Sequence, residues 1–76
     1  MSTNEHLTKK QISIVVPIYC EEGSLRLLIE RLDFVTGKLV EFDFHYVLVN
    51  DGSKDGSWEL IKKFASESSR VIGIDF

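Results

Sequence analysis

The sequence has one cysteine, Cys20, and one proline, Pro17. A single thiol cannot form an intramolecular disulfide or supply a cysteine-based metal site. Small disulfide-stapled domains and cysteine-based zinc domains are therefore excluded. Such sparing use of cysteine fits a reducing compartment, so we expect a cytoplasmic protein.

Long apolar runs and a strong charge bias are also missing. No run approaches the roughly 18 residues needed to cross a bilayer. Residues 1–11 form a polar leader without the apolar segment of a signal peptide. The net charge is -3, which does not predict binding to nucleic acid or to anionic lipid. Any contact with a membrane would have to come from sequence outside this chain.

The apolar residues of the sequence are sufficient for one small domain. The chain has 76 residues, of which 43% are hydrophobic. A domain of this size buries only roughly 60% of the surface of its unfolded chain. Short β-branched runs at residues 12–18, 44–49 and 71–76 predict three strands.

Two helices are predicted between these strands. After a turn at residues 19–23, apolar residues recur at spacings of three and four, with Ser24 as the N-cap and Gly37 as the C-cap. The predicted inner face of this helix consists of Leu25, Leu28, Ile29, Leu32 and Val35. The second helix follows a loop at residues 50–56, with Asp55 or Ser57 as its cap. Its predicted inner face consists of Leu60, Ile61, Phe64 and Ala65.

The element order β-α-β-α-β predicts an α/β fold with three parallel strands and two helices. Right-handed crossovers would join the strands into one half of a doubly wound, Rossmann-like sheet. We expect the first strand to be buried on both faces. In the usual 3-2-1-4 strand order it would also form an unpaired edge of the sheet, which invites pairing with another chain and a homo-oligomer.

Acidic residues follow the first two strands, at the end of the sheet where α/β folds bind ligands. Asp51 follows the second strand between Asn50 and Gly52, and its carboxylate could accept hydrogen bonds from a ribose hydroxyl or a base N–H. Alternatively, Asp51 and Asp55 only close turns and cap a helix.

Pro17, Tyr19 and Glu21 alternate after the first strand, so their side chains would point the same way in an extended segment. Tyr19 could line a base and Glu21 could accept hydrogen bonds from it. The alternative is that acidic residues here only favour the start of a helix.

Other chemistries have little support in the sequence. Neither a dinucleotide-binding glycine motif nor a P-loop follows the first strand, and the nearby acids would repel phosphate. A pyrophosphate would therefore need a divalent cation. His6 and His45 are isolated, and we expect structural roles for both. Two acids beside Cys20 disfavour its thiolate, so we do not expect a nucleophile there.

Two motifs resemble those of family 2 glycosyltransferases. Residues 14–22, IVVPIYCEE, are similar to the V-V-P-x-Y-N-E-E opening of that family, and residues 47–57, VLVNDGSKDGS, resemble its V-D-D-G-S-x-D-G-S segment. The likeness covers roughly residues 12–76, which we therefore expect to be one incomplete domain. The branch most similar to the chain comprises the polyprenyl-phosphate sugar transferases, such as dolichol-phosphate mannose synthase and bactoprenol glucosyltransferase. Cys20 stands where Asn is usual, and Asn50 stands where Asp is common.

This resemblance implies a GT-A fold and a UDP- or GDP-sugar donor, with Mg²⁺ or Mn²⁺ in the full-length enzyme. The positions that match the family's nucleotide pocket are Pro17, Tyr19, Glu21, Val49 and Asp51. The resemblance implies no catalytic residue and no metal ligand in this chain, because the family's D-x-D motif would follow the third strand. The implied acceptor is a lipid phosphate or a glycan, in cell-wall or glycolipid biosynthesis. The full-length enzyme would then act at the cytoplasmic face of a membrane.

Three hypotheses follow. The chain is the nucleotide-binding portion of a hexosyltransferase, and its 76 residues alone do not transfer sugar. Alternatively, it is a non-catalytic truncated module that self-associates through its open sheet edge. A third hypothesis is a receiver-like regulator, which would need a phosphoacceptor Asp after the third strand.

Overall fold

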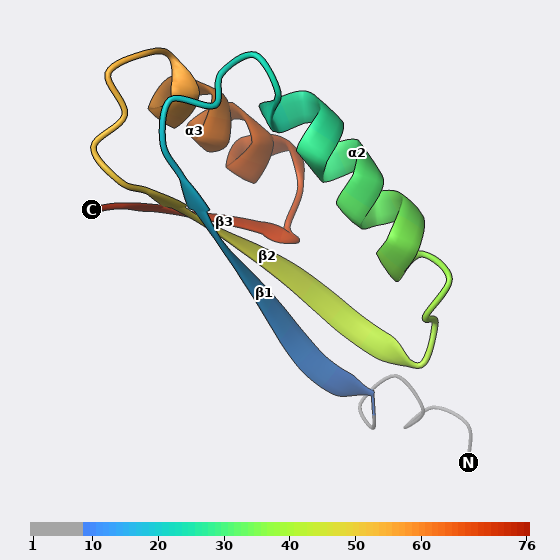
Figure 1. Ribbon diagram of the computed structural model, residues 1–76. Helices are drawn as coiled ribbons and strands as arrows, with labels where there is room; N and C mark the ends of the chain where they lie inside the picture. Colours follow the sequence, from blue (N-terminus) through green and yellow to red (C-terminus); the bar gives the residue numbers. More distant parts are fainter. Residues whose placement is uncertain (1–8) are drawn as a thin grey trace.

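The computed structural model describes residues 9–76, which contain three strands and two helices (Figure 1). Their bounds are β1 Lys10–Ile18, α2 Leu25–Thr36, β2 Phe42–Asn50, α3 Ser57–Glu67 and β3 Val71–Asp75. This order confirms the predicted β-α-β-α-β arrangement. Both β1 and β2 begin two residues before their predicted starts. His6 and most of the predicted leader lie outside the described residues.

The sheet is parallel throughout, with the strand order β1-β2-β3. Its register aligns Ile18, Asn50 and Asp75, so the three strands end side by side. Two right-handed crossovers that step in the same direction place both helices on one face. Figure 1 shows α2 and α3 on the same side of the sheet.

The core lies between this face and the two helices. Its buried apolar residues are Ile18, Leu25, Phe44, Tyr46, Leu48, Ile61, Phe64 and Val71. Helix α3 approaches β3 closely at Gly73, where a Cβ would lie 2.7 Å from Cγ2 of Ile61. A glycine is therefore needed at this point of contact, because any side chain would push the helix away from the strand.

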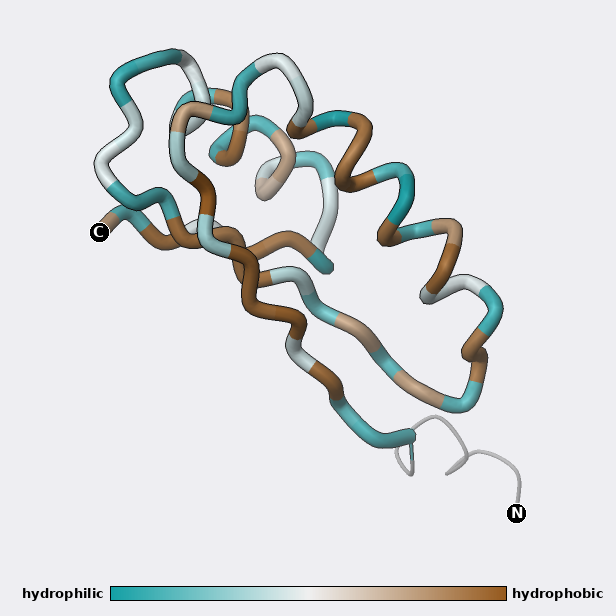
Figure 2. Tube along the Cα trace, viewed as in Figure 1, coloured by the Kyte–Doolittle hydropathy of each residue, from teal (hydrophilic) through white to brown (hydrophobic). Residues whose placement is uncertain are grey.

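The other face of the sheet is not covered by any described residue. Val15 is 63% exposed, and Ile72 and Ile74 on β3 are 43% and 44% exposed. Figure 2 shows hydrophobic colouring along much of β1 and β3. Burial of β1 on both faces was thus a wrong prediction for residues 9–76, because both crossovers place their helices on the same face. β1 pairs only with β2 among the described strands, as expected for an edge.

The residues predicted to form the inner faces of the two helices are buried or half-buried, with one exception. Val35 is 57% exposed, and Thr36 is buried instead. Thr36 also fits the helical spacing after Leu32, and the hydroxyl of Tyr46 lies 2.9 Å from its Oγ1 while donating a 2.6 Å hydrogen bond to Oδ1 of Asp33. Burial is the main cause that raises the pKa of Tyr46 above its ordinary value, and the bond to Asp33 adds to it.

The predicted helix caps are only partly correct. Ser24 stands at the N-cap position of α2 but makes no side-chain capping bond. Gly37 is the C-cap, as predicted, and its N–H donates to the carbonyl oxygen of Asp33. At α3 the N-cap is Gly56, and Asp55 accepts a hydrogen bond from the N–H of Ser57. Asp55 thus binds the N–H of Ser57, the first residue of α3, from the position just before the N-cap.

Candidate functional site at the carboxyl end of the sheet

Two loops meet at the carboxyl ends of β1 and β2. We call residues 19–24 the first loop and residues 51–56 the second loop. The second loop is tied to β1 at its start, because the N–H of Asp51 donates a 2.9 Å bond to the carbonyl oxygen of Ile18. On the other side, the N–H of Phe76 donates a 2.9 Å bond to the carbonyl oxygen of Asn50. Backbone bonds thus fix the place where each loop leaves the sheet.

Side chains from the second loop and from the start of α3 bind three successive N–H groups of the first loop. The N–H of Cys20 donates to Oγ of Ser53 at 2.9 Å, and that of Glu21 donates to Oγ of Ser57 at 2.8 Å. The N–H of Glu22 donates to Oδ2 of Asp55 at 3.2 Å. These three contacts replace the backbone partners that an irregular loop lacks. They hold the two loops together.

One contact runs in the opposite direction. The N–H of Gly56 donates a 3.0 Å bond to Oε1 of Glu22. A Cβ at Gly56 would lie 2.5 Å from the other carboxylate oxygen, Oε2, so a larger residue here would displace the Glu22 side chain. Glu22 and Gly56 therefore belong to the network that joins the loops, a role that the sequence did not predict for either.

Cys20 adopts a left-handed backbone conformation with φ of 51°. Asn, the residue usual at this position in the similar family, enters that region more readily than most residues. Here the turn is fixed without an amide, because Ser53 binds the N–H of Cys20 and the N–H of Lys54 lies 3.5 Å from its Sγ. The exposed thiol is therefore part of a braced turn.

The network also sets the electrostatics of Asp55. Hydrogen bonding to Ser57 is the leading cause that lowers the pKa of the Asp55 carboxyl below its ordinary value of 3.8. The carboxylate is thus in its charged, accepting form at neutral pH. The structural alternative considered for Asp55, that it only closes a turn and serves the start of a helix, agrees with these contacts.

The structure brings together four of the five predicted nucleotide-binding residues. Pro17 and Val49 are register partners on the uncovered face of the sheet. Tyr19 and Asp51 come one residue after the ends of β1 and β2, and both are exposed. Ligand-accessible side chains thus gather where these two strands end.

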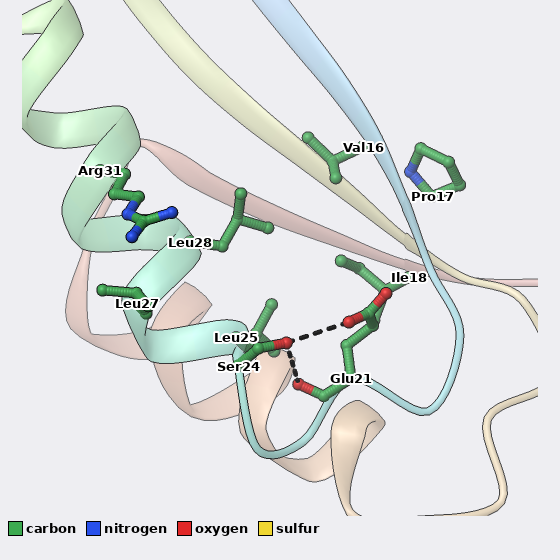
Figure 3. A pocket seen from close by; sticks show the side chains of 9 residues that line it. All are labelled: Val16, Pro17, Ile18, Glu21, Ser24, Leu25, Leu27, Leu28 and Arg31. Atoms are coloured by element: carbon green, nitrogen blue, oxygen red, sulfur yellow. Dashed lines mark hydrogen bonds between the residues drawn. The ribbon is translucent and has the colours of Figure 1, made fainter.

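Glu21, the fifth predicted residue, lies on the helix side of β1. Figure 3 shows its carboxylate beside Ser24, whose hydroxyl donates a 3.0 Å bond to Oε2. In the same view Pro17 points away from α2, on the far side of the strand. The alternation that placed Pro17, Tyr19 and Glu21 on one side ends with the strand at Ile18.

A cavity of about 340 Å³ opens between β1 and α2. Its walls are largely apolar, formed by Val16, Ile18, Leu25 and Leu28 among others, and Glu21 and Arg31 are its charged lining residues. It lies beside the carboxyl end of β1, so a ligand bound there would contact the first loop.

Sequence reasoning missed the residues that build this site without being exposed. Ser57 is fully buried and Asn50 is 4% exposed. Asn50 donates a 2.8 Å bond from Nδ2 to Oδ1 of Asp75. The available signal was positional: Asn50 and Asp75 stand at the ends of two predicted strands that a parallel sheet brings together.

Metal binding and membrane crossing were also examined over residues 9–76. In this part of the chain no group of three or more His, Cys, Asp or Glu side chains could hold a metal ion. No helix within the same range has the length and apolar character to cross a bilayer.

Comparison with known proteins agrees with the two sequence motifs. The model of a family described as "Glycosyl transferase family 2" matches residues 13–76. The chain is 41% identical over 75 residues to the undecaprenyl-phosphate 4-deoxy-4-formamido-L-arabinose transferase of Yersinia enterocolitica, covering 97% of this chain and 22% of that protein. It is 39% identical over 66 residues to the Aeromonas hydrophila protein of the same name, covering 86% of this chain and 20% of that protein. It therefore spans about a fifth of the length of these relatives.

Proposed function

Because this chain belongs to glycosyl transferase family 2, we propose that its two loops bind the nucleotide of a sugar donor. The enzyme concerned would transfer a sugar from a UDP- or GDP-sugar donor to a polyprenyl phosphate. Relatives that share about 40% of its residues are named as transferases acting on undecaprenyl phosphate, which is a polyprenyl phosphate. Such an acceptor would place the reaction at the cytoplasmic face of a membrane.

One observation carries the proposal more than any other. Ser53, Asp55 and Ser57 all bind backbone N–H groups, whereas Asp51 and Tyr19 remain exposed at the ends of adjacent strands. A site that binds a nucleotide needs such a division between residues that fix loops and residues that face the ligand.

Each exposed residue has a role that fits its chemistry. The Asp51 carboxylate would accept hydrogen bonds from a ribose hydroxyl or a base N–H. Tyr19 would stack on the base, and Pro17 with Val49 would form an apolar surface beneath it. Glu21 would approach the nucleotide from the cavity that Arg31 also lines.

Binding and bond-making are separate in this proposal. We assign nucleotide placement to residues 9–76 and no catalytic residue. No step of transfer is assigned to the Mg²⁺ or Mn²⁺ expected in the full-length enzyme. Incubation of the purified chain with UDP-glucose, Mg²⁺ and undecaprenyl phosphate is expected to give no lipid-linked sugar. Formation of that product would contradict this separation.

Calorimetric titration of the chain with UDP and with GDP tests the nucleotide site. We expect binding of one of them, and its loss in Asp51→Ala. Asp43→Ala is the matched control, because Asp43 lies near the amino end of the same strand and should not affect binding. Absence of binding to both nucleotides at millimolar concentration, or equal loss in both variants, would overturn the proposal.

A second candidate function is a non-catalytic module that self-associates. The observation in its favour is that β1 pairs only with β2 in the described chain and leaves its other edge open. Open strand edges pair readily with other chains. In that case, sedimentation velocity would show a concentration-dependent dimer that Val15→Lys abolishes. A monomer at all concentrations would exclude this candidate.

A further inference from the structure

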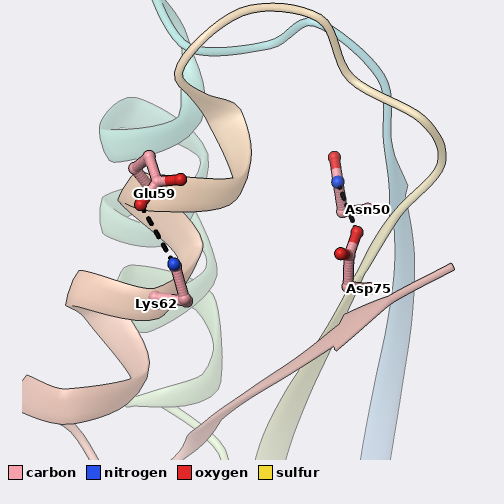
Figure 4. Close-up of polar contacts among 4 residues, drawn as sticks. All are labelled: Asn50, Glu59, Lys62 and Asp75. Atoms are coloured by element: carbon pink, nitrogen blue, oxygen red, sulfur yellow. Dashed lines mark hydrogen bonds and ion pairs between the residues drawn. The ribbon is translucent and has the colours of Figure 1, made fainter.

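Asn50 and Asp75 form a hydrogen-bonded pair across β2 and β3. Their side chains stand at paired positions at the carboxyl ends of the two strands, and Nδ2 of Asn50 donates to Oδ1 of Asp75 at 2.8 Å (Figure 4). Asn50 is buried at 4% exposure, whereas Asp75 is exposed. A buried amide thus fixes the orientation of a carboxylate that solvent can reach.

The amide does not complete its own hydrogen bonding. Oδ1 of Asn50 is buried and has no partner among residues 9–76. A buried acceptor left unpaired destabilises a fold, and an apolar side chain of similar size would avoid that loss. The hydrogen bond that Asn50 does make goes to an exposed carboxylate, which water would otherwise solvate. The stability of the fold therefore does not explain why position 50 is an asparagine. Residues that lower stability in this way are expected at functional sites.

We propose that Asn50 is a positioning residue that holds Asp75 as a further ligand-binding carboxylate for the sugar donor. This inference rests on the proposed function of the two loops. With Oδ1 held by Asn50, Oδ2 of Asp75 makes no hydrogen bond within residues 9–76 and is free to accept one from a ligand. The pair supplies no charge change or bond chemistry; it fixes one acceptor in space.

The negative charge around the site determines which part of the ligand Asp75 can contact. Asp51 and Asp55 add negative charge to the adjoining loop, so a diphosphate would be repelled. A neutral donor, such as a hydroxyl of the ribose or of the transferred sugar, suits a carboxylate instead. Two interstrand spacings, about 10 Å, separate the ends of β1 and β3. A nucleotide-sugar that begins at Tyr19 can span this distance.

Titration with UDP and with UDP-glucose measures the contribution of Asp75. In Asp75→Asn we expect affinity to fall about tenfold or more, because a hydrogen bond to a charged group is lost. Loss with both ligands assigns the contact to the nucleoside, and loss with UDP-glucose alone assigns it to the transferred sugar. Asp43→Asn makes the same chemical change near the other end of the sheet and should leave affinity unchanged.

A double-mutant cycle tests whether Asn50 acts through Asp75. Asn50→Ala should weaken binding in the wild-type background and have no further effect in the Asp75→Asn background. A purely structural role would weaken binding equally in both. Thermal melting of each variant confirms folding, and Asp75→Asn carries the test alone if Asn50→Ala does not fold.

The outcomes separate this inference from the proposed function. If the wild-type chain binds and Asp51→Ala does not, but Asp75→Asn binds as tightly as the wild type, the role of Asp75 is refuted and the nucleotide site stands. If the wild-type chain binds neither UDP nor GDP, both proposals fail.

Discussion

Two polar networks hold this chain together, and they differ in where their hydrogen bonds go. Between α2 and β2, the hydroxyl of Tyr46 contacts the side chains of Asp33 and Thr36. At the carboxyl end of the sheet, side chains of Ser53, Asp55 and Ser57 bind backbone N–H groups of the first loop. The first network joins two regular elements, and the second joins two loops.

The difference explains why the second network, rather than the first, supports the residues proposed to face a ligand. A helix and a strand already satisfy their own backbone groups, so the Tyr46 network only fixes how α2 packs. Loops cannot satisfy their backbone groups internally. Where neighbouring side chains do so, the loops become rigid enough to present residues such as Asp51 and Tyr19 in a fixed geometry.

The largest effect is expected from removing the buried hydroxyl of the loop network. Ser57→Ala leaves the N–H of Glu21 without its 2.8 Å partner. We expect a loss of about 1–3 kcal/mol in the free energy of unfolding, measured by urea denaturation. Ser66→Ala is the control, because this exposed hydroxyl of the same helix bonds only to a neighbouring carbonyl. Equal losses in the two variants would show that the loop contact contributes nothing.

A smaller loss is expected in the network between α2 and β2. Tyr46→Phe removes the hydroxyl but keeps the buried ring, and exposed Asp33 can turn to water. We expect about 0.5–1.5 kcal/mol of destabilisation, with unchanged affinity for UDP or GDP. Thermal melting measures the loss of stability, and titration measures the affinity for UDP or GDP. Reduced nucleotide affinity would mean that the two networks are coupled, contrary to the difference between them described above.

Acid is expected to weaken the loop network through Asp55. Because its folded pKa is depressed, its stabilising contribution is present above its ordinary value of 3.8 and is lost as pH falls through the folded pKa. Wild type should therefore exceed Asp55→Asn in stability at pH 7, with the difference shrinking towards pH 3. Urea denaturation across that range gives the difference at each pH. A difference that stays constant would contradict the assigned cause.

The smallest effect is expected outside both networks. Glu59 and Lys62 form a 3.0 Å ion pair on α3, drawn in Figure 4, with side chains 74% and 52% exposed. Glu59→Gln should cost at most about 0.5 kcal/mol, and less in high salt. A larger loss in thermal melts would show that exposed charges on α3 matter as much as the contacts between loops.

Local patterns predicted the elements well because apolar spacing and turn residues act over a few positions. The order of strands and helices, the parallel sheet and the open edge at β1 were all expected and are observed. Failures occurred where a side chain takes a hydrogen-bond partner that apolar spacing does not reveal. Val35 was placed in the core because its spacing fits, but Thr36 is the buried residue there and contacts the hydroxyl of Tyr46. Ser24 was expected to cap α2, but its hydroxyl donates to Glu21.

The candidate site shows the same division. Two motifs in the sequence were sufficient to indicate the family, and the residues that they predict to face a ligand lie at or near the strand ends. The motifs did not distinguish residues that face a ligand from residues that fix the loops. The side chains of Ser53 and Asp55 could bind a ligand as well as that of Asp51. That separation depends on hydrogen bonds between residues 33 to 36 positions apart.

The sequence by itself determined the elements, their parallel order and the family, because each depends on local spacing and on short motifs. Only the tertiary structure decided which side chains are left for a ligand. Parallel strands bring the two loops together, and the unsatisfied N–H groups of the first loop bind Ser53, Asp55 and Ser57. It also decided that Asn50 meets Asp75, because register between β2 and β3 exists only once the sheet has formed.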